Sequence, residues 1–204
     1  MDIVQAITNI TDNALREAIK KEYEEVAINP KKGYHFHTGR EAASRIGYDP
    51  DLYAGLPEEN IASFAGTGNP FSLGAIHPGE VVVDVGSGAG FDSLIAARLV
   101  GPRGRVVGID MTDAMIEKAK SGAKNMDAPN AQFRRGLADN LPLEDDFADL
   151  LISNGVLNLT PDKNKTLKEW ARVLKPGGRM FIGDIVIEKK MSQEALDDIS
   201  LWTG

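Results

Sequence analysis

The sequence has 204 residues, with 42% hydrophobic and 26% charged residues, which is typical of one globular domain with its own core. The formal net charge of -7 argues against a basic face for nucleic acid. The absence of cysteine excludes disulfides, Cys-ligated zinc, iron–sulfur clusters and thiol catalysis. No segment resembles a secretory signal or approaches the ~20 apolar residues of a membrane span, so a cytoplasmic location without membrane partners is expected.

Residues 1–78 predict an N-terminal helical and loop segment that covers the rest of the protein. Apolar residues recur at helical spacing up to about residue 28 and indicate one or two helices, which end at Asn29-Pro30. Frequent glycine and proline from Lys31 to Pro78 predict short helices and loops. We therefore expect a division into a covering segment, 1–78, and a core, 79–204.

Residues 79–204 alternate between strand-like and helix-like segments. Strands are expected at Val81–Val85, Arg105–Ile109, Gln132–Arg134, Ala148–Ser153 and Arg179–Val186. Helices are expected at Ser93–Val100, Asp113–Asn125 and Asp162–Val173. This alternation predicts an α/β fold, a Rossmann-like doubly wound, mostly parallel sheet with helices on both faces.

A glycine-rich turn follows the first strand, in the segment VVVDVGSGAGFD. Glycines at this place let the backbone turn sharply and approach a ligand, and open parallel sheets bind ligands at such strand ends. Free N–H groups at the start of the next helix favour an anionic group. Asp110 ends the second strand about 20 residues later, where an acid can accept both hydroxyls of a ribose. Together these features predict a cofactor of the nucleoside type.

The residue at position 91 separates two classes of cofactor. The dinucleotide fingerprint GxGxxG would need Gly or Ala there, and the chain has Phe91. The spacing GxGxG after Asp84 suits S-adenosylmethionine, whose methionyl end can occupy the glycine turn while its ribose meets Asp110. S-adenosylmethionine is favoured over NAD on this feature, and a glycine loop that only makes a tight turn is the remaining alternative.

Four segments carry a family resemblance: DVGSGAGFD, GIDMTDAMIEKAK, LADNLPLEDDFADLLISNGVLNL and RVLKPGGRMFIGDI. In order and spacing they resemble the class I methyltransferases of the ubiquinone/menaquinone C-methyltransferase type. Asp110-Met111-Thr112 and the phrases SFAGTGNPF, LNLTPDK and LWTG resemble the arsenite methyltransferase branch. The resemblance implies methyl transfer from S-adenosylmethionine, with S-adenosylhomocysteine as product, to a small-molecule acceptor.

The resemblance also implies a set of site residues. The methionyl end would be surrounded by Asp84, Gly86, Ser87 and Gly88, and the ribose hydroxyls would bind Asp110. The adenine would pack against Met111 and meet Ala138 and Asp139 at its edge, while Asn154 and Gly155 would lie near the sulfonium. A simple turn at Asp139-Asn140 is the alternative for that pair.

The metalloid-binding cysteines of the arsenite branch are missing. Trivalent arsenic needs soft thiolate ligands, and the matching positions hold Thr67 and Gly155, with a third after Gly204. The resemblance therefore supports methyl transfer but not arsenite as the acceptor. A non-catalytic module that binds S-adenosylmethionine is the second hypothesis, and an NAD-dependent oxidoreductase is the third.

No catalytic base is assigned from the sequence. Displacement at an activated methyl carbon needs alignment more than acid–base groups, so no base is obligatory. If one is used, the candidates are Tyr34, His35 and His37 in the covering segment. A metal site is not expected, since His77 is the only other histidine and lies far along the chain.

The last predicted strand would lie at the edge of the sheet, with one side unpaired. The fold normally continues into a hairpin after strand five, and this hairpin is absent from the sequence as given. A helix is expected at Met191–Trp202, but a helix on the sheet face cannot satisfy an open edge. We expect either a longer native chain or a homodimer that pairs at the exposed edge strand.

Overall fold

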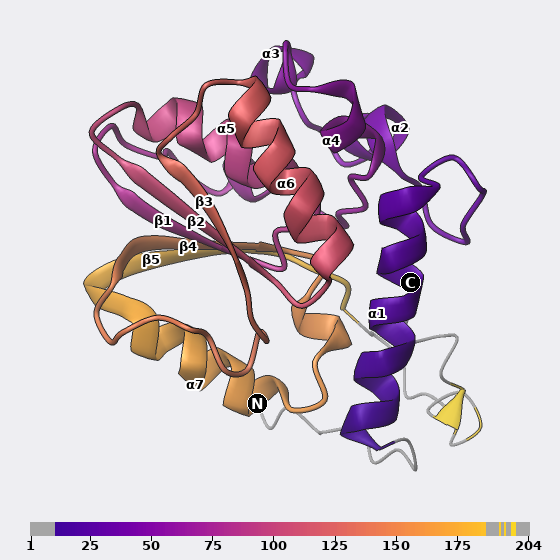
Figure 1. Cartoon of the computed structure of the whole chain (residues 1–204). Coiled ribbons are helices and arrows are strands. Elements are labelled where there is room, and N and C mark those ends of the chain that lie inside the picture. Colours follow the sequence, from indigo (N-terminus) through magenta and orange to yellow (C-terminus); the bar gives the residue numbers. More distant parts are fainter. Residues whose placement is uncertain (1–10, 187–191, 193, 195–196, 199–204) are drawn as a thin grey trace.

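A five-stranded parallel sheet forms the centre of the protein, in a computed structural model that describes residues 11–186, 192, 194, 197 and 198. The strand order is β3-β2-β1-β4-β5 (Figure 1). The strands are β1 Val81–Val85, β2 Arg105–Asp110, β3 Ala131–Arg135, β4 Ala148–Asn154 and β5 Leu174–Gly183. The chain winds outwards from β1 to β3 and then crosses back to β4, so the order reverses between β1 and β4. The predicted Rossmann-like, doubly wound α/β fold is confirmed.

Helices cover both faces of this sheet. Helices α5, Phe91–Val100, and α6, Asp113–Asn125, lie on one face, and α7, Lys163–Val173, lies on the other (Figure 1). Alternate side chains of the buried strands point to opposite faces, so two apolar cores form. Val82 and Val106 belong to the core under α5 and α6, while their neighbours Val83 and Val107 belong to the core over α7.

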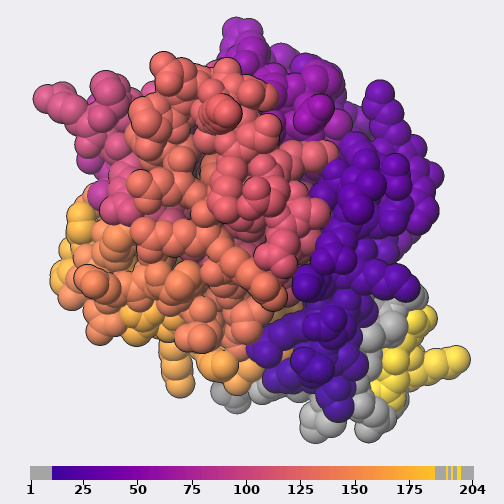
Figure 2. Space-filling view, viewed as in Figure 1, coloured from indigo at the N-terminus to yellow at the C-terminus, as the bar shows by residue number. Residues whose placement is uncertain are grey.

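The covering segment consists of short helices that follow one long helix. The helices are α1 Asp12–Ile28, α2 Gly39–Arg45, α3 Pro50–Tyr53 and α4 Glu58–Ala62, followed by the 3₁₀ turn η1, Pro70–Ser72. In the space-filling view α1 lies against the surface of α6 (Figure 2). Buried Asn60 on α4 fixes the segment to the core by donating from Nδ2 to the carbonyl oxygens of Ala89, at 2.6 Å, and Lys118, at 3.1 Å.

Phe91 connects the covering segment to the core through an aromatic cluster. Its ring centroid lies 4.2 Å from that of Phe64 and 5.4 Å from those of Tyr48 and Tyr53. The residue that fills the third position of the glycine motif therefore packs under the covering segment. None of the helices in the part of the chain that the structure describes is long and apolar enough to cross a membrane.

Most predicted elements agree with the structure within two residues, but the prediction for the last strand was wrong at both ends. β5 begins at Leu174 rather than Arg179, because Leu174 already pairs with Ala148 and a bulge follows. It ends at Gly183 because the Asp184 carboxylate turns to accept the backbone N–H of Leu157 at 2.8 Å. The predicted helix Met191–Trp202 lies mostly outside the described residues, as does the first part of the predicted N-terminal helix.

Candidate cofactor-binding site

A cavity lies at the carboxyl ends of the strands around the point where the strand order reverses. All ten residues predicted for the site line this one cavity: Asp84, Gly86, Ser87, Gly88, Asp110, Met111, Ala138, Asp139, Asn154 and Gly155. It encloses about 1030 Å³, counting space open to solvent at its mouth. That is the size range of small-molecule sites in proteins. Residues spread over some 70 positions of sequence therefore converge on one ligand-sized space.

The glycine turn presents bare backbone to this cavity. Gly86 and Gly88 have φ angles of +72° and +50°, in the left-handed region that favours glycine. A Cβ at Gly88 would meet no atom within 4 Å, so a ligand can approach the main chain there. The turn is held in place by Asp110, whose Oδ2 accepts the Gly88 N–H at 2.9 Å.

Asp110 joins the end of β2 to the glycine turn. Its Oδ1 accepts the N–H of Thr112 at 2.8 Å, while its Oδ2 binds the glycine turn. Burial raises the pKa of this carboxyl, and the amide N–H bonds from Thr112 and Gly88 oppose the rise. Each oxygen keeps accepting capacity, so the fixed carboxylate can still accept hydroxyl donors from a ligand.

Two buried acids form the floor of the cavity. Asp84 on β1 accepts from Ser93 Oγ at 2.5 Å, and Asp92 on α5 accepts from Tyr48 Oη at 2.6 Å. Burial, followed by the charge of Asp92, raises the pKa of Asp84 to about 8. Burial raises the pKa of Asp92 to about 6, against the hydrogen bonds from Tyr48 and Asn154. Within the described residues neither acid forms an ion pair with lysine or arginine, so the floor suits a cationic ligand.

Asn154 at the end of β4 connects the covering segment to the strand ends. Its Oδ1 accepts the N–H groups of Thr67 and Gly68, at 2.8 and 2.9 Å. Its Nδ2 donates to Asp92 Oδ2 at 3.0 Å and to the Gly68 carbonyl oxygen at 2.8 Å. The carboxamide thus uses both its donor and its acceptor side to fix the 66–68 segment beside the acids.

The rim of the cavity is formed by a loop that carries Ala138 and Asp139. The buried Asp139 carboxylate forms ion pairs with Arg16 of α1, at 2.8 Å, and with Lys165 of α7, at 2.7 Å. Asp139 is 7% exposed, so this contact with α1 closes one side of the cavity. The loop is a turn, in which the Asn140 N–H donates to the Leu137 carbonyl oxygen at 3.1 Å, and its Asp139 side chain is buried rather than solvated.

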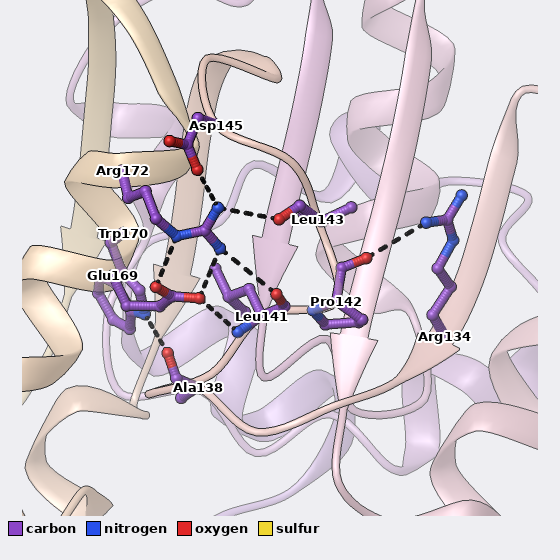
Figure 3. Close-up of polar contacts among 9 residues, drawn as sticks. All are labelled: Arg134, Ala138, Leu141, Pro142, Leu143, Asp145, Glu169, Trp170 and Arg172. Atoms are coloured by element: carbon purple, nitrogen blue, oxygen red, sulfur yellow. Dashed lines mark hydrogen bonds and ion pairs between the residues drawn. The ribbon is translucent and has the colours of Figure 1, made fainter.

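Helix α7 holds the rim loop from behind through the polar cluster shown in Figure 3. Trp170 Nε1 donates to the Ala138 carbonyl oxygen at 2.9 Å, and Glu169 accepts the Leu141 N–H at 2.7 Å. Arg172 donates to the Leu143 carbonyl oxygen at 3.0 Å and pairs with Glu169 at 2.7 Å. The loop therefore has a fixed position relative to the sheet.

A second, smaller cavity of about 500 Å³, again counting open space, adjoins the first. The two share five lining residues: Tyr23, Ala65, Gly66, Gly155 and Leu159. Of the three candidate bases, His37 lines the second cavity, with Nδ1 3.3 Å from Glu41, whereas Tyr34 and His35 line neither cavity. No group of three or more potential metal ligands occurs in the described part of the chain.

Several residues of the site were missed by the sequence analysis. Arg16 and Tyr23 come from α1, and the helical spacing of α1 predicts the helix but not what it docks against. Asp92 stands next to the glycine motif and could have been found, because an acid directly after a glycine turn at a helix start lies close to any ligand there.

Comparison with known proteins identifies the family. The profile of a family described as "Methyltransferase domain" matches residues 76–203. The chain belongs to this methyltransferase family. An arsenite methyltransferase of Halobacterium salinarum is 44% identical over 167 residues, which are 82% of this chain and 42% of that protein. A ubiquinone/menaquinone biosynthesis C-methyltransferase of Haemophilus ducreyi is 37% identical over 109 residues, 52% of this chain and 42% of that protein.

A solved structure supports the same assignment. The crystal structure of an arsenic(III) S-adenosylmethionine methyltransferase from Chlamydomonas reinhardtii matches with a TM-score of 0.66 and 40% identity, over 71% of this chain and 51% of that chain. The family resemblance stated from the sequence is confirmed. This methyltransferase-family chain spans less than half the length of the arsenite methyltransferase of Halobacterium salinarum that it matches.

Proposed function

We propose that this methyltransferase-family protein binds S-adenosylmethionine in the larger cavity and transfers the methyl group to a small-molecule acceptor. The observation that carries the proposal is the convergence of all ten predicted residues on one cavity at the switch point of the sheet. The methyltransferase family of the chain favours this cofactor over NAD.

The residues of the cavity fit this cofactor. Ser87 Oγ is buried and has no hydrogen-bond partner among the described residues, which leaves it available to a ligand. The bare backbone at Gly88 gives room for the methionyl end. Asp84 and Asp92 have no cationic partner there, and the cofactor carries positive charge at its sulfonium and its ammonium group.

We assign the contacts residue by residue. Asp84, Gly86, Ser87 and Gly88 would hold the methionyl end, and Asp110 would accept the ribose hydroxyls. The adenine would pack against Met111 and meet Ala138 and Asp139 at its edge, with Asn154 and Gly155 near the sulfonium. All of these residues line the same cavity.

The protein's share of the chemistry is alignment and exclusion of water. When bound, S-adenosylmethionine supplies a methyl carbon that its sulfonium activates for in-line displacement. Asn154 fixes the 66–68 segment, and Arg16 closes α1 over the rim through Asp139, so the cavity is walled on both sides. His37 is the candidate base that reaches a cavity, and Glu41 at its Nδ1 orients the ring so that Nε2 can accept a proton.

The geometry argues against protein-bound trivalent arsenic as the acceptor. A Cβ placed on Gly155 would lie 3.1 Å from Thr67 Oγ1, so the two positions that hold cysteines in the arsenite branch are neighbours here. A hydroxyl and a hydrogen replace the two soft ligands. We therefore propose an arsenite-methyltransferase-like enzyme with a different small-molecule acceptor.

Calorimetry and methyl transfer test the proposal. S-adenosylmethionine and S-adenosylhomocysteine should bind the purified protein, and radiolabelled methyl groups should reach a metabolite pool. Binding without any transfer would favour the non-catalytic module instead. Tighter binding of NAD than of S-adenosylhomocysteine would contradict the cofactor assignment.

We also propose a homodimer through the sheet edge. β5 pairs with β4 on one side, and no strand among the described residues pairs with its other side, so a second copy could use that edge. A monomeric mass by light scattering at high concentration would rule this out. Absence of nucleic-acid partners, which rests on the net charge, and a cytoplasmic location remain predictions.

A further inference from the structure

We infer that the second cavity binds the methyl acceptor and that it takes a small, flat, apolar and neutral molecule with one hydrogen-bond donor, such as a simple phenol. This inference rests on the proposed function, because it assumes that the larger cavity holds the methyl donor. Its argument uses the position, the shape and the polar groups of the second cavity.

The position follows from the wall that the two cavities share. Gly66 and Gly155 both line the larger and the smaller cavity, and neither has a side chain to fill the space between them. A Cβ at Gly66 would overlap the Asn154 carboxamide, so the backbone approaches the end of β4 as closely as it can. Methyl transfer needs the two reacting atoms ~3–3.5 Å apart, and a wall of glycine permits that approach.

The shape is set by aromatic and aliphatic side chains. The rings of Tyr23 and Phe36 are nearly parallel, with an interplanar angle of 15° and centroids 6.1 Å apart. Both line the second cavity, together with the aliphatic side chains of Ile46 and Leu159. A flat apolar molecule can lie against such rings in an offset stack.

The one lysine or arginine among the described residues that line this cavity, Arg45, is already paired. Arg45 and His37 both line it, and both contact the same carboxylate, Glu41, at 3.1 and 3.3 Å. No positive charge is thus reserved for an anionic ligand. This pairing favours a neutral acceptor over a carboxylate or a phosphate ester.

Asn158 supplies the one specific polar contact that we infer. Its backbone is in use, since its N–H donates to Asp184 Oδ2 at 3.3 Å and its carbonyl oxygen accepts from Lys163 Nζ at 3.2 Å. Its side-chain Oδ1, in contrast, is buried without a partner in the described part of the structure. Buried acceptors in proteins are normally satisfied, so a residue that lines a cavity with an unsatisfied oxygen points to a donor on the ligand.

The test uses two probes that differ by one hydrogen-bond donor. 4-Methylphenol has the hydroxyl, and 4-methylanisole has a methoxy group at the same position of the same ring, so it keeps the oxygen and lacks the donor hydrogen. Binding of each is measured by ligand-observed NMR to protein saturated with S-adenosylhomocysteine, after calorimetry has shown that this nucleoside binds. We expect the phenol to bind at least tenfold more tightly than its methyl ether.

Variants then locate the contact. Asn158→Leu should reduce the affinity for 4-methylphenol about tenfold, as expected for loss of one hydrogen bond of about 1.4 kcal/mol, and leave 4-methylanisole unchanged. The exposed Asn125→Leu on α6 is the matched control and should change neither affinity. Phe36→Ala should weaken both probes alike, because it removes the stacking surface and not the polar contact.

The outcomes separate the two levels of the argument. If S-adenosylhomocysteine does not bind, the proposed function fails and this inference fails with it. If it binds but the two probes bind equally, or neither binds, or 4-methylphenol displaces the nucleoside, the inference is overturned while the proposed function stands. The comparison of probes on the unmodified protein decides the question even if a variant does not fold.

Discussion

Asp84 offers a test of how the site is built, because its burial should destabilise the protein at neutral pH. The carboxyl is 2% exposed and its pKa is raised to about 8, by burial and then by the charge of Asp92. A raised pKa means that the folded state prefers the neutral acid. The stability that this group contributes is therefore present below the unfolded-state pKa near ~4 and is lost as pH rises to about 8.

The magnitude follows from linkage. At pH 7 the unfolded carboxyl is ionised, and holding its folded counterpart neutral over ~3 pH units costs about 4 kcal/mol. Asn in place of Asp removes that cost and can still accept the bond from Ser93 Oγ. Its new amide N–H groups need partners, which costs about 1–3 kcal/mol. We expect Asp84→Asn to stabilise the protein by about 2 kcal/mol at pH 7, or about 4–8 °C in Tm, and by somewhat more at pH 8.

The assay is thermal unfolding of the protein without ligand between pH 4 and pH 8, with Asp149→Asn as the control. Burial tends to raise the pKa of Asp149, but the bonds from Lys175 Nζ, at 2.7 Å, and the Val81 N–H lower it overall. A lowered pKa gives stability that is present above the unfolded-state value and is lost as pH falls. The control should therefore lower Tm at pH 8, and its effect should fade on acidification.

The refuting result is equally specific. If Asp84→Asn lowers Tm at pH 8, or shifts it equally at pH 4 and pH 8, then Asp84 is not held as a neutral acid and the floor of the cavity is not short of positive charge. The same variant should weaken binding of S-adenosylmethionine, because the site loses the acid that faces a cation.

Further predictions concern the ligands of both cavities. S-adenosylmethionine binding at pH 7 should release protons, because a cation beside Asp84 lowers the pKa of that carboxyl from about 8. The affinity for S-adenosylmethionine should therefore rise with pH up to about 8. Calorimetry in buffers of different ionisation enthalpy measures this release, and no release would mean that Asp84 is already ionised without the ligand. Asp110→Ala should weaken S-adenosylhomocysteine by about 1.5–3 kcal/mol in calorimetry, and unchanged affinity would remove Asp110 from the site. The double variant Thr67→Cys with Gly155→Cys should bind phenylarsine oxide more tightly than either single variant, because two adjacent thiols chelate trivalent arsenic. Equal binding by a single variant would contradict the adjacency of the two positions.

The sequence predicted the elements best where one periodicity decides their limits. Val81–Val85 is apolar except for Asp84, as a central strand buried on both faces should be, and Asp113–Asn125 has one buried stripe. Both match the structure residue for residue. β5 was predicted poorly, because its first residues pair through a bulge around Gly177, which has a φ of +81°. A bulge depends on the partner strand, and the partner is not visible in local sequence.

The cavity could be predicted because parallel strands bring their carboxyl ends to one edge. Asp84, Asp110 and Asn154 each end or approach the end of a different strand, so topology alone places them together. Arg16 and Tyr23 could not be placed that way. Their helix docks on α6 through contacts that are made only in the folded protein, and an arginine in the sequence gives no sign that it will pair with a buried acid.

The distribution of charge between the two cavities is the strongest argument for two different occupants. Asp84 and Asp92 on the floor of the larger cavity have no cationic partner among the described residues, and their raised pKa values show what this costs without a ligand. In the smaller cavity Arg45 is paired with Glu41, and most of the lining residues are apolar. A cationic methyl donor compensates the first charge pattern, and a neutral acceptor leaves the second undisturbed. Transfer of the methyl group to an acceptor hydroxyl would break the bond from the methyl carbon to the sulfonium sulfur, form one to the hydroxyl oxygen and release the hydroxyl proton, for which His37 is the candidate acceptor.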